Sequence, residues 1–228
     1  MRPINVGLLG IGTVGGGTWD VLKRNADEIQ RRAGRAIRIS QVADKAVGKA
    51  RKRVGKKAKV LSDPFRVVRD AQIDIIVELI GGTTIAKELV LEAIRNGKHV
   101  VTANKALLAT HGTEIFAAAQ KNAVMVAFEG SVGGGIPIIK ALREGLAANR
   151  IEWIAGIING TSNFILSEMR DKSLDFSAAL GDAQRRGYAE ADPTFDIEGI
   201  DAAHKLTILS ALAFGIPMQF KKCFREGI

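Results

Sequence analysis

The chain has 228 residues, a length that suits one large domain or two modest ones. Its composition, 46% hydrophobic and 25% charged, is that of an ordinary globular protein. No stretch approaches the roughly 18 apolar residues of a membrane span, and the opening MRPINVGLLGIG lacks the regions of a signal peptide. The single cysteine, Cys223, excludes an intrachain disulfide and fits a reducing cytosol, so we expect a cytoplasmic protein.

The net charge is +9, and much of it lies in one segment. Residues 45–59, KAVGKARKRVGKKAK, contain eight Lys or Arg and no acid. Such a run is typical of a solvated helix face, of a nucleic-acid contact or of a site for a cofactor phosphate. No aromatic residue interleaves it, which argues against a stacking platform for single-stranded nucleic acid.

Strand and helix patterns alternate through the first 128 residues. Strands are expected at 4–9, 36–43, 74–80, 98–103 and 123–128, and helices at 14–32, 64–70, 84–96 and 105–121. This alternation predicts an α/β fold with a Rossmann-type, doubly wound parallel sheet.

The pattern changes past residue 129, where the glycine-rich EGSVGGGIPI leads into a helix. The run EWIAGIIN at 152–159 predicts a strand, and helices are expected near 162–170, 175–186 and 201–214. We therefore expect two domains, 1–130 and 131–228, the second of them a smaller α+β domain.

A glycine turn follows the first strand directly. Gly10, Gly12 and Gly15 form a G-x-G-x-x-G between this strand and a helix. The first glycine allows the tight turn, the second lets the backbone approach a pyrophosphate, and the third lets the helix pack close to the strand. This context predicts binding of a dinucleotide at the helix N-terminus.

The end of the second strand carries two opposing signals about the cofactor. Asp44 is placed to bond the ribose hydroxyls of NAD, whereas Lys45, Lys49 and Arg51 suit the additional phosphate of NADP. The sequence leaves the choice open, with the basic residues favouring NADP.

An acidic loop precedes the last helix. Within EADPTFDIEGIDAAHKLTIL, carboxylates occur at Glu190, Asp192, Asp196, Glu198 and Asp201. If Asp201 opens a helix, Lys205 shares its face with apolar residues. A lysine on such a stripe is destabilising unless it is paired. Either Lys205 snorkels to water beside Asp201, or the acidic loop needs a cation for chemistry.

Several motifs, in order, resemble those of the homoserine dehydrogenase family. They are GLLGIGTVGGG, ELIGGT, TANKALLA, EGSVGGGIPI, GIINGTSNFIL and GYAEADPTFDIEGIDAAHKL, and the resemblance runs from the first strand to about Phe214. It implies interconversion of L-homoserine and L-aspartate 4-semialdehyde with NAD(P), on the route to threonine, methionine and isoleucine. It also implies that 1–130 bind the cofactor and 131–228 bind the substrate.

The resemblance also implies roles for individual residues. Ile11, Gly12, Thr13 and Val14 match the pyrophosphate turn, and Lys105 matches a lysine beside cofactor and substrate. Glu190 matches the acid that holds the substrate ammonium, and Lys205 the proton donor. Glu129 and the carbonyls of Val132, Gly134 and Ile136 match a site for a monovalent cation, usually sodium.

The residue types agree with this chemistry. The acidic loop, Asp196 included, can receive an ammonium, and backbone amides near Gly160 and Thr161 can receive a carboxylate. Lys205 would then exchange a proton with the reacting oxygen. Burial and the positive charge of Lys105 favour a neutral Lys205, whereas Asp201 favours a charged one, and the sequence leaves this open.

Three other interpretations are weaker. A phosphorylating semialdehyde dehydrogenase needs a cysteine nucleophile, but Cys223 lies in FKKCFREG, outside any strand-turn-helix site. His99, His111 and His204 lack metal-ligand spacing. Family members run longer, so we also expect part of the catalytic fold and any regulatory domain to be missing. The alternative to an active enzyme is therefore a truncated, inactive dinucleotide-binding module. An apolar second-domain strand makes a homodimer the expected assembly.

Overall fold

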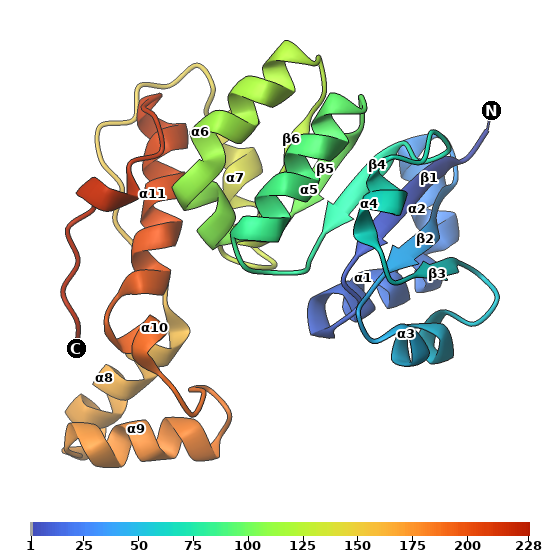
Figure 1. Cartoon of the computed structure of the whole chain (residues 1–228). Helices are drawn as coiled ribbons and strands as arrows, with labels where there is room; N and C mark the ends of the chain where they lie inside the picture. The colour runs from blue at the N-terminus through green and yellow to red at the C-terminus, as the bar shows by residue number, and fades with distance from the viewer. Residues whose placement is uncertain (1) are drawn as a thin grey trace. The chain divides into compact units, whose positions relative to one another are not determined.

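The structure, a computed structural model, describes residues 2–228. The chain forms two compact units, Met1–Ser131 and Val132–Ile228, each described by itself below. Figure 1 colours the chain from blue at the N-terminus to red at the C-terminus, so the first unit runs from blue to green.

The first unit is built on a six-stranded parallel sheet, which confirms the predicted fold class. In chain order the strands are β1 (Ile4–Leu9), β2 (Ile37–Ala43), β3 (Lys59–Leu61), β4 (Ile75–Glu78), β5 (His99–Thr102) and β6 (Val126–Ala127). Their spatial order is β3-β2-β1-β4-β5-β6, so the order reverses between β1 and β4. Parallel strands end at one edge, and the gap at a reversal is where doubly wound sheets bind ligands.

Helices connect the strands: α1 (Thr13–Arg24), α2 (Ala26–Ala33), α3 (Val47–Val54), α4 (Pro64–Val68), α5 (Thr84–Arg95) and α6 (Lys105–Lys121). The single helix expected at 14–32 is two helices, because the chain leaves helical geometry at Asn25. The short helix at Pro64 begins as predicted, since the Asp63 carboxylate accepts the Phe65 amide as an N-cap.

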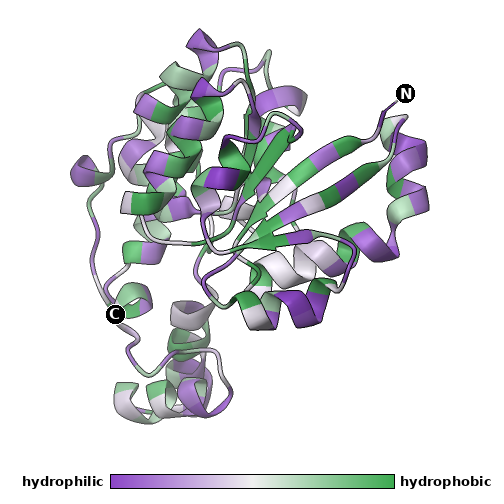
Figure 2. Ribbon diagram, turned by 45° about the vertical axis from the view of Figure 1, so that its right-hand side comes forward, coloured by the Kyte–Doolittle hydropathy of each residue, from purple (hydrophilic) through white to green (hydrophobic). Residues whose placement is uncertain are grey.

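The sheet is apolar on both faces, as expected when helices cover both sides. Leu8, Leu9 and Ile76 have no exposed surface, and the inner strands are predominantly green in Figure 2. A Cβ added at Gly7 would lie 2.5 Å from the Val67 side chain, so α4 packs directly against β1 at this glycine.

A buried cation ties down the opposite, amino-terminal edge of the sheet. Lys98, the residue just before β5, is 4% exposed, and its ammonium donates to the carbonyls of Asp70 (2.6 Å) and Ile73 (2.8 Å). Desolvation lowers the pKa of Lys98, opposed by the charges of Asp70 and Asp74. These bonds connect the loop before β4 to β5 and remain far from the carboxyl ends of the strands.

The regular elements of the second unit, residues 132–228, are all helices or helical turns. After the turn η1 (Glu129–Ser131) it contains α7 (Ile138–Lys140), the π-helical turn η2 (Ala141–Gly145), α8 (Gly160–Lys172), α9 (Phe176–Arg185), α10 (Thr194–Ile197), α11 (Ile200–Phe214) and the 3₁₀ turn η3 (Phe220–Lys222). A small core of Ile165, Ala179, Ala183 and Ala189 joins α8 and α9.

The strand expected at 152–159 does not form. A strand requires a hydrogen-bonded neighbour, and no segment of residues 132–228 pairs with EWIAGIIN. Trp153 and Ile157 are 75% and 79% exposed, so this apolar run lies open to solvent. Trp19, by contrast, is buried in the core of the first unit.

Within residues 2–228, none of the helices combines the length and the hydropathy that crossing a bilayer requires.

An ion-pair network on α5 generates a pH-dependent prediction. The Glu92 carboxylate accepts from Arg69 (2.8 Å) and Arg95 (2.7 Å), and these hydrogen bonds lower its pKa to about 2. Because the folded pKa lies below the ordinary value, the contribution to stability is complete above about pH 4.5 and disappears as the pH falls towards 2.

We expect Glu92→Gln to lower the free energy of unfolding by roughly 1 kcal/mol at pH 7 and by much less at pH 2.5. Urea unfolding at both pH values measures the difference. Glu88→Gln is the control, because that carboxylate lies exposed on the same helix without a hydrogen bond to residues 2–228. Equal effects of Glu92→Gln at both pH values would contradict the prediction.

Candidate active site

The glycine turn at the end of β1 has the close contacts that its spacing predicts. Gly10 has φ +87°, a left-handed conformation, and its amide donates to the Ala43 carbonyl (2.8 Å). A Cβ at Gly15 would overlap the Gly10 carbonyl oxygen, so α1 lies directly against the turn. A Cβ at Gly12 would meet no heavy atom within 4 Å. The backbone is therefore open where a pyrophosphate must approach, and these residues fit the dinucleotide.

The predicted pyrophosphate donors are the first residues of α1 and the turn before it. Thr13 and Val14 begin the helix and are exposed, so their N–H groups belong to the first turn that lacks intrahelical partners. The Ile11 amide instead donates to the Asp44 carboxylate (2.8 Å), whose other oxygen accepts from Ala46 (2.7 Å). Asp44 thus connects the end of β2 to the glycine turn.

A cleft of about 660 Å³ opens along these strand ends. It is lined by Gly10, Gly12, Ala43, Asp44, Lys45, Ser62, Pro64, Phe65, Leu79, Ile80 and Ile85. These residues follow β1, β2, β3 and β4, so the cleft crosses the reversal of strand order. Its lining is mostly apolar, with Asp44 and Lys45 as the charged groups.

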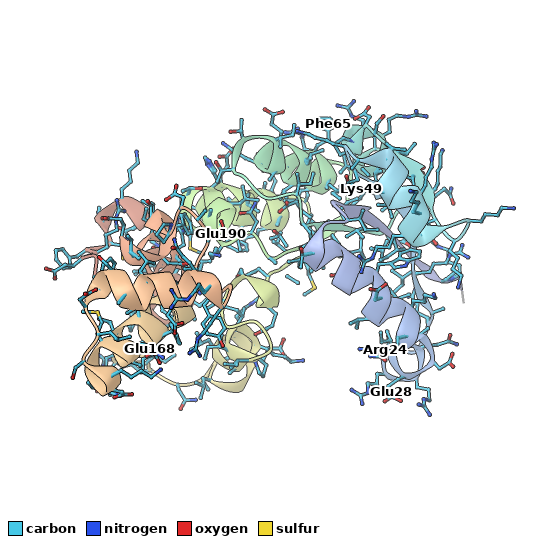
Figure 3. The ribbon with its side chains drawn as sticks, turned by 90° about the horizontal axis from the view of Figure 1, so that it is seen from below. Arg24, Glu28, Lys49, Phe65, Glu168 and Glu190 are labelled. Atoms are coloured by element: carbon cyan, nitrogen blue, oxygen red, sulfur yellow. The ribbon has the colours of Figure 1, made fainter. Side chains whose placement is uncertain are left out.

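The basic run contributes two sets of cations. Lys45 lines the main cleft, whereas Lys49 (Figure 3), Lys52 and Arg53 line a hollow of about 450 Å³ with Ile11. Arg53 also lies against α1, since a Cβ at Gly16 would be 2.5 Å from its guanidinium carbon and the guanidinium pairs with Asp20 (2.5 Å). Arg51, expected from the sequence, lines neither space. Lys52 and Arg53 were not predicted, although helical spacing puts residues 49, 52 and 53 on one face.

In the second unit, Lys205 is held by oxygen acceptors. Its ammonium donates to the Asp201 carboxylate (2.6 Å) and to the Ile158 carbonyl (2.7 Å), and 19% of its side chain is exposed. Asp201 is buried, and its pairing with Lys205 along α11 is the i, i+4 contact that the sequence indicated. The apolar helix therefore tolerates the lysine because its charge is compensated.

Asn159 joins this pair to the acidic loop. Its amide nitrogen donates to Asp196 (2.8 Å) and Asp201 (2.9 Å), and its amide oxygen caps α8 by accepting from Ser162 (2.8 Å). From the sequence, only the backbone amides near this residue were expected to take part. An Asn immediately before a helix is an N-cap signal that could have identified the side chain.

The other predicted substrate residues lie around this cluster. Gly160 and Thr161 form the first turn of α8, and the Thr161 hydroxyl donates to the Tyr188 carbonyl (2.8 Å). Glu190 is exposed between α9 and α10, and its carboxylate makes no hydrogen bond to residues 2–228 (Figure 3). The Glu190 side chain is thus available to a ligand.

The predicted cation ligands lie in a glycine-rich segment. Gly133 and Gly135 have φ +59° and +88°, and the Ile136 amide donates to the Gly133 carbonyl (2.7 Å). No three His, Cys, Asp or Glu side chains of residues 2–228 are grouped to hold a metal ion. A cation here would depend mainly on carbonyl oxygens, a donor set that suits a hard cation.

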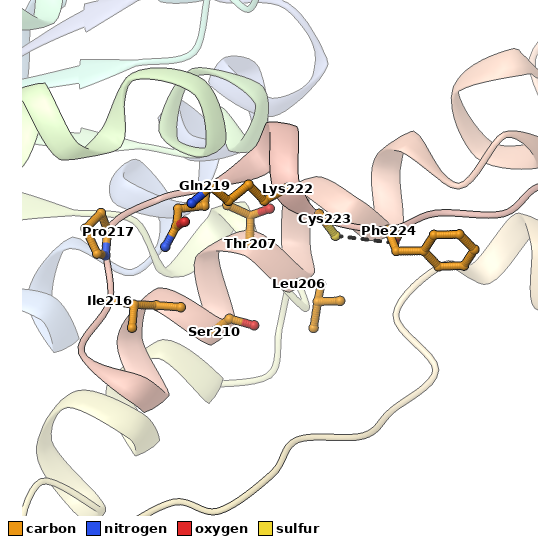
Figure 4. Close-up of a pocket in the computed structure, with 9 residues that line it drawn as sticks. All are labelled: Leu206, Thr207, Ser210, Ile216, Pro217, Gln219, Lys222, Cys223 and Phe224. Atoms are coloured by element: carbon orange, nitrogen blue, oxygen red, sulfur yellow. Dashed lines mark hydrogen bonds between the residues drawn. The ribbon is translucent and has the colours of Figure 1, made fainter.

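A separate hollow of about 390 Å³ lies beside the C-terminal half of α11 (Figure 4). Its lining is mostly apolar and includes Lys222 and Cys223, whose thiol donates to the Phe224 carbonyl (3.6 Å). Neither Lys205 nor any carboxylate lines it. No His, Asp or Glu of residues 2–228 lines it to activate the cysteine, so its lining does not favour thioester chemistry. His204 lies buried between the rings of Phe195 and Phe220.

The sheet topology and the glycine turn define the class: an NAD(P)-binding protein with a Rossmann fold. Comparisons with known proteins identify the particular family. The family described as "Homoserine dehydrogenase, NAD binding domain" matches residues 10–129, and the one described as "Homoserine dehydrogenase" matches residues 137–228. The chain belongs to the homoserine dehydrogenase family, as its motifs indicated.

The sequence is similar to curated homoserine dehydrogenases along its whole length. It is 62% identical to a homoserine dehydrogenase of Pseudomonas aeruginosa and 64% identical to one of Neisseria gonorrhoeae, in each case over 100% of this chain and 52% of the relative. The chain therefore spans about half the length of these curated relatives.

Solved structures show the same similarity. A homoserine dehydrogenase from Thiobacillus denitrificans superposes with a TM-score of 0.96 at 69% identity, covering 100% of this chain and 53% of that one. A hyperthermophilic archaeal homoserine dehydrogenase in complex with NADPH superposes with a TM-score of 0.82 at 26% identity. The match covers 95% of this chain and 71% of the archaeal chain.

The open space at Gly12 generates a prediction that separates binding from folding. Gly12→Ala should fold normally, because its φ of −63° suits alanine and the methyl meets no neighbour. The methyl would nevertheless hold a pyrophosphate away from the backbone. We expect the dissociation constants of NADPH and NADH, measured by fluorescence titration, to rise by about tenfold or more.

Gly17→Ala is the matched control, because its Cβ is also free of neighbours within 4 Å but lies inside α1. It should bind as the parent does and gain up to about 1 kcal/mol of stability. Unchanged NADPH and NADH affinity in Gly12→Ala would exclude the turn as the pyrophosphate site.

Proposed function

We propose that the chain supplies the cofactor and substrate residues of an enzyme that interconverts L-homoserine and L-aspartate 4-semialdehyde with NAD(P). Residues 1–130 form the NAD(P)-binding domain and residues 131–228 belong to the substrate domain. The observation that carries this proposal is the Lys205 cluster, in which one ammonium is held by Asp201 and the Ile158 carbonyl beside a second acid, Asp196.

The substrate presents three polar groups, and the second unit offers a partner for each. The Glu190 carboxylate is exposed and receives the ammonium, and Asp196 follows six residues later in α10. The free amides of Gly160 and Thr161, at the start of α8, receive the carboxylate. Lys205 gives a proton to the carbonyl oxygen in reduction, or takes one from the hydroxyl in oxidation.

The other members of the cluster orient Lys205. Asp201 and the Ile158 carbonyl accept two of its three N–H bonds, which leaves one for the substrate oxygen. Asp201 in turn is held by Asn159. Asp201 is thus a positioning partner, while Lys205 touches the reacting atom. The nicotinamide, when bound, supplies or accepts the hydride, and Lys105 at the start of α6 lies on the cofactor side.

A monovalent cation, with sodium as the candidate, would be held by Glu129 and the carbonyls of Val132, Gly134 and Ile136. The left-handed glycines between these carbonyls support this, because they curve the segment. Activity measured with sodium replaced by tetramethylammonium tests it, and full activity in the large cation would reject the site.

We propose a homodimer that covers the exposed apolar segment 152–159. Trp153 and Ile157 are exposed there, and an apolar segment without a strand partner is suited to contact with another chain. Sedimentation at micromolar concentration should show twice the monomer mass, and a monomer would reject the proposal.

We also propose a cytoplasmic location, which the biosynthetic role and the single cysteine support, and cell fractionation tests it.

The cofactor proposal is that NADP binds at least as tightly as NAD. Lys45 lies in the cleft beside Asp44, and Lys49, Lys52 and Arg53 line the adjoining hollow. Lys45→Ala should weaken NADP by about 1–3 kcal/mol and change NAD much less, because only NADP has the additional phosphate. Titration of both cofactors measures this, with exposed Lys121→Ala as control. A clear preference of the parent for NAD would overturn the proposal.

The catalytic proposal predicts two different kinetic failures. Lys205→Ala should lower kcat and kcat/KM together by roughly 10²–10⁴, because proton transfer occurs only in the transition state. Glu190→Gln should mainly raise KM, because its contact exists before and during hydride transfer. Homoserine-dependent NAD(P)H absorbance is the assay.

Lys172→Ala is the matched control, since Lys172 forms an i, i+4 pair with Glu168 on an exposed face of α8 in the same unit. Thermal unfolding of each variant separates loss of function from loss of fold. Near-normal kcat in Lys205→Ala would make this lysine a structural partner of Asp201 and leave Lys105 as the leading proton donor.

A further inference from the structure

A carboxylate at the end of β4 is completely buried. Glu78 has no exposed surface, and no Lys or Arg among residues 2–228 forms an ion pair with it. A buried carboxylate without a cation is destabilising unless hydrogen bonds compensate for the loss of water. The hydrogen bonds to the Glu78 carboxylate therefore indicate its role in the fold.

Three donors converge on Glu78 from two loops. One oxygen accepts the amides of Ile80 (2.9 Å) and Gly81 (3.3 Å), and the other accepts the Thr102 hydroxyl (2.7 Å) from the end of β5. Gly81 and Gly82 both have left-handed φ values, +81° and +70°. This backbone turn folds the loop after β4 around the carboxylate, as an anion-binding nest would.

The bonds continue from Thr102 into the start of α6. The Thr102 hydroxyl accepts the Asn104 amide (3.0 Å), the Asn104 side chain caps α6 by accepting from Leu107 (3.0 Å), and it donates to the Gly82 carbonyl (2.6 Å). The bond from Asn104 to Gly82 returns to the loop after β4, whose amides donate to Glu78. Together with the backbone between Gly81 and Gly82, these hydrogen bonds form a closed ring that links the ends of β4 and β5.

This ring requires an acceptor at position 78. The Thr102 hydroxyl has one proton, which it gives to Glu78, and its lone pairs then face the Asn104 amide. A glutamine would turn its NH₂ group either to the two amides, which also donate, or to the Thr102 hydroxyl. In the first case the amides lose their acceptor, and in the second the hydroxyl accepts and its own proton loses the carboxylate. Chained bonds of this kind strengthen one another, and losing one weakens the others.

The ring stands next to the cofactor cleft. Ile80, whose amide Glu78 accepts, lines the cleft together with Gly10, and the Leu79 carbonyl lies 2.7 Å from where a Gly10 Cβ would be. Asp44 and β2 mark the adenosine side of the strand reversal, so β4 and β5 lie on the nicotinamide side. Lys105 follows Asn104 directly as the first residue of α6.

We propose that Glu78 is a positioning residue that, through Thr102 and Asn104, sets the loop after β4 and the first turn of α6 for the nicotinamide half of the cofactor. This rests on the proposed function. It explains why a carboxylate is kept in the core at this place. The buried cation Lys98, at the other end of β5, has no such connection to the cleft.

The test compares two ligands that differ only in the nicotinamide ring. Glu78→Gln in the full chain should raise the dissociation constant of NADPH about tenfold and change that of 2′-phospho-ADP-ribose less than twofold. Amide hydrogen exchange without ligand should become about tenfold faster in residues 79–82 and 104–107. Thr102→Val, which lacks the hydroxyl, should reproduce both effects, and Thr102→Ser, which keeps it, should restore them.

Lys98→Met is the control for general loss of stability, and it should change neither the ratio of the two dissociation constants nor exchange in these segments. Equal weakening of both ligands by Glu78→Gln, or normal exchange in both segments, would overturn the proposal. If the parent chain binds neither ligand, the cofactor assignment fails, and hydrogen exchange alone then decides the positioning role of Glu78. If Glu78→Gln does not fold, the Thr102→Val and Thr102→Ser pair decides it.

Discussion

The contact of Gly15 with the Gly10 carbonyl is the constraint on which the cofactor unit depends. No side chain fits between them, so the first turn of α1 lies directly at the end of β1. Its unpaired amides and the positive end of its dipole thereby reach the edge where the parallel strands end. Asp44 from β2 and Leu79 after β4 approach the same turn, and the cleft forms around it. A bulkier residue at position 15 would separate all of these groups.

Each edge of the sheet contains a buried charged residue, and the two residues have different roles. At the amino edge, Lys98 gives its protons to loop carbonyls and connects strands without facing a cleft. At the carboxyl edge, Glu78 accepts from the loop after β4 and from Thr102 at the end of β5, beside the cleft. Each charge is compensated by hydrogen bonds to backbone or hydroxyl groups, and these bonds order the loops that supply them. The sheet interior between the two edges is apolar.

The second unit shows that a structural and a chemical role of one lysine are compatible. The pairing of Lys205 with Asp201 is what makes the cation tolerable on an apolar helix. The same pair, with the Ile158 carbonyl, points the ammonium in one direction and leaves a proton for a ligand. An unpaired lysine at this site would turn towards water and lose that orientation.

What the sequence determined by itself depends on near neighbours along the chain. The glycine spacing, the apolar runs, the Asp63 cap and the i, i+4 pairing of Asp201 with Lys205 all follow from local geometry, so they could be predicted. Tertiary structure decided what depends on distant partners. The polar three-residue β3 exists because β2 pairs with it, whereas the strongly apolar 152–159 segment has no partner in its unit and forms no strand. The hydrogen bond from Thr102 to Glu78 joins residues 24 apart in sequence, and no local pattern marks it, because it exists only once two parallel strands lie side by side.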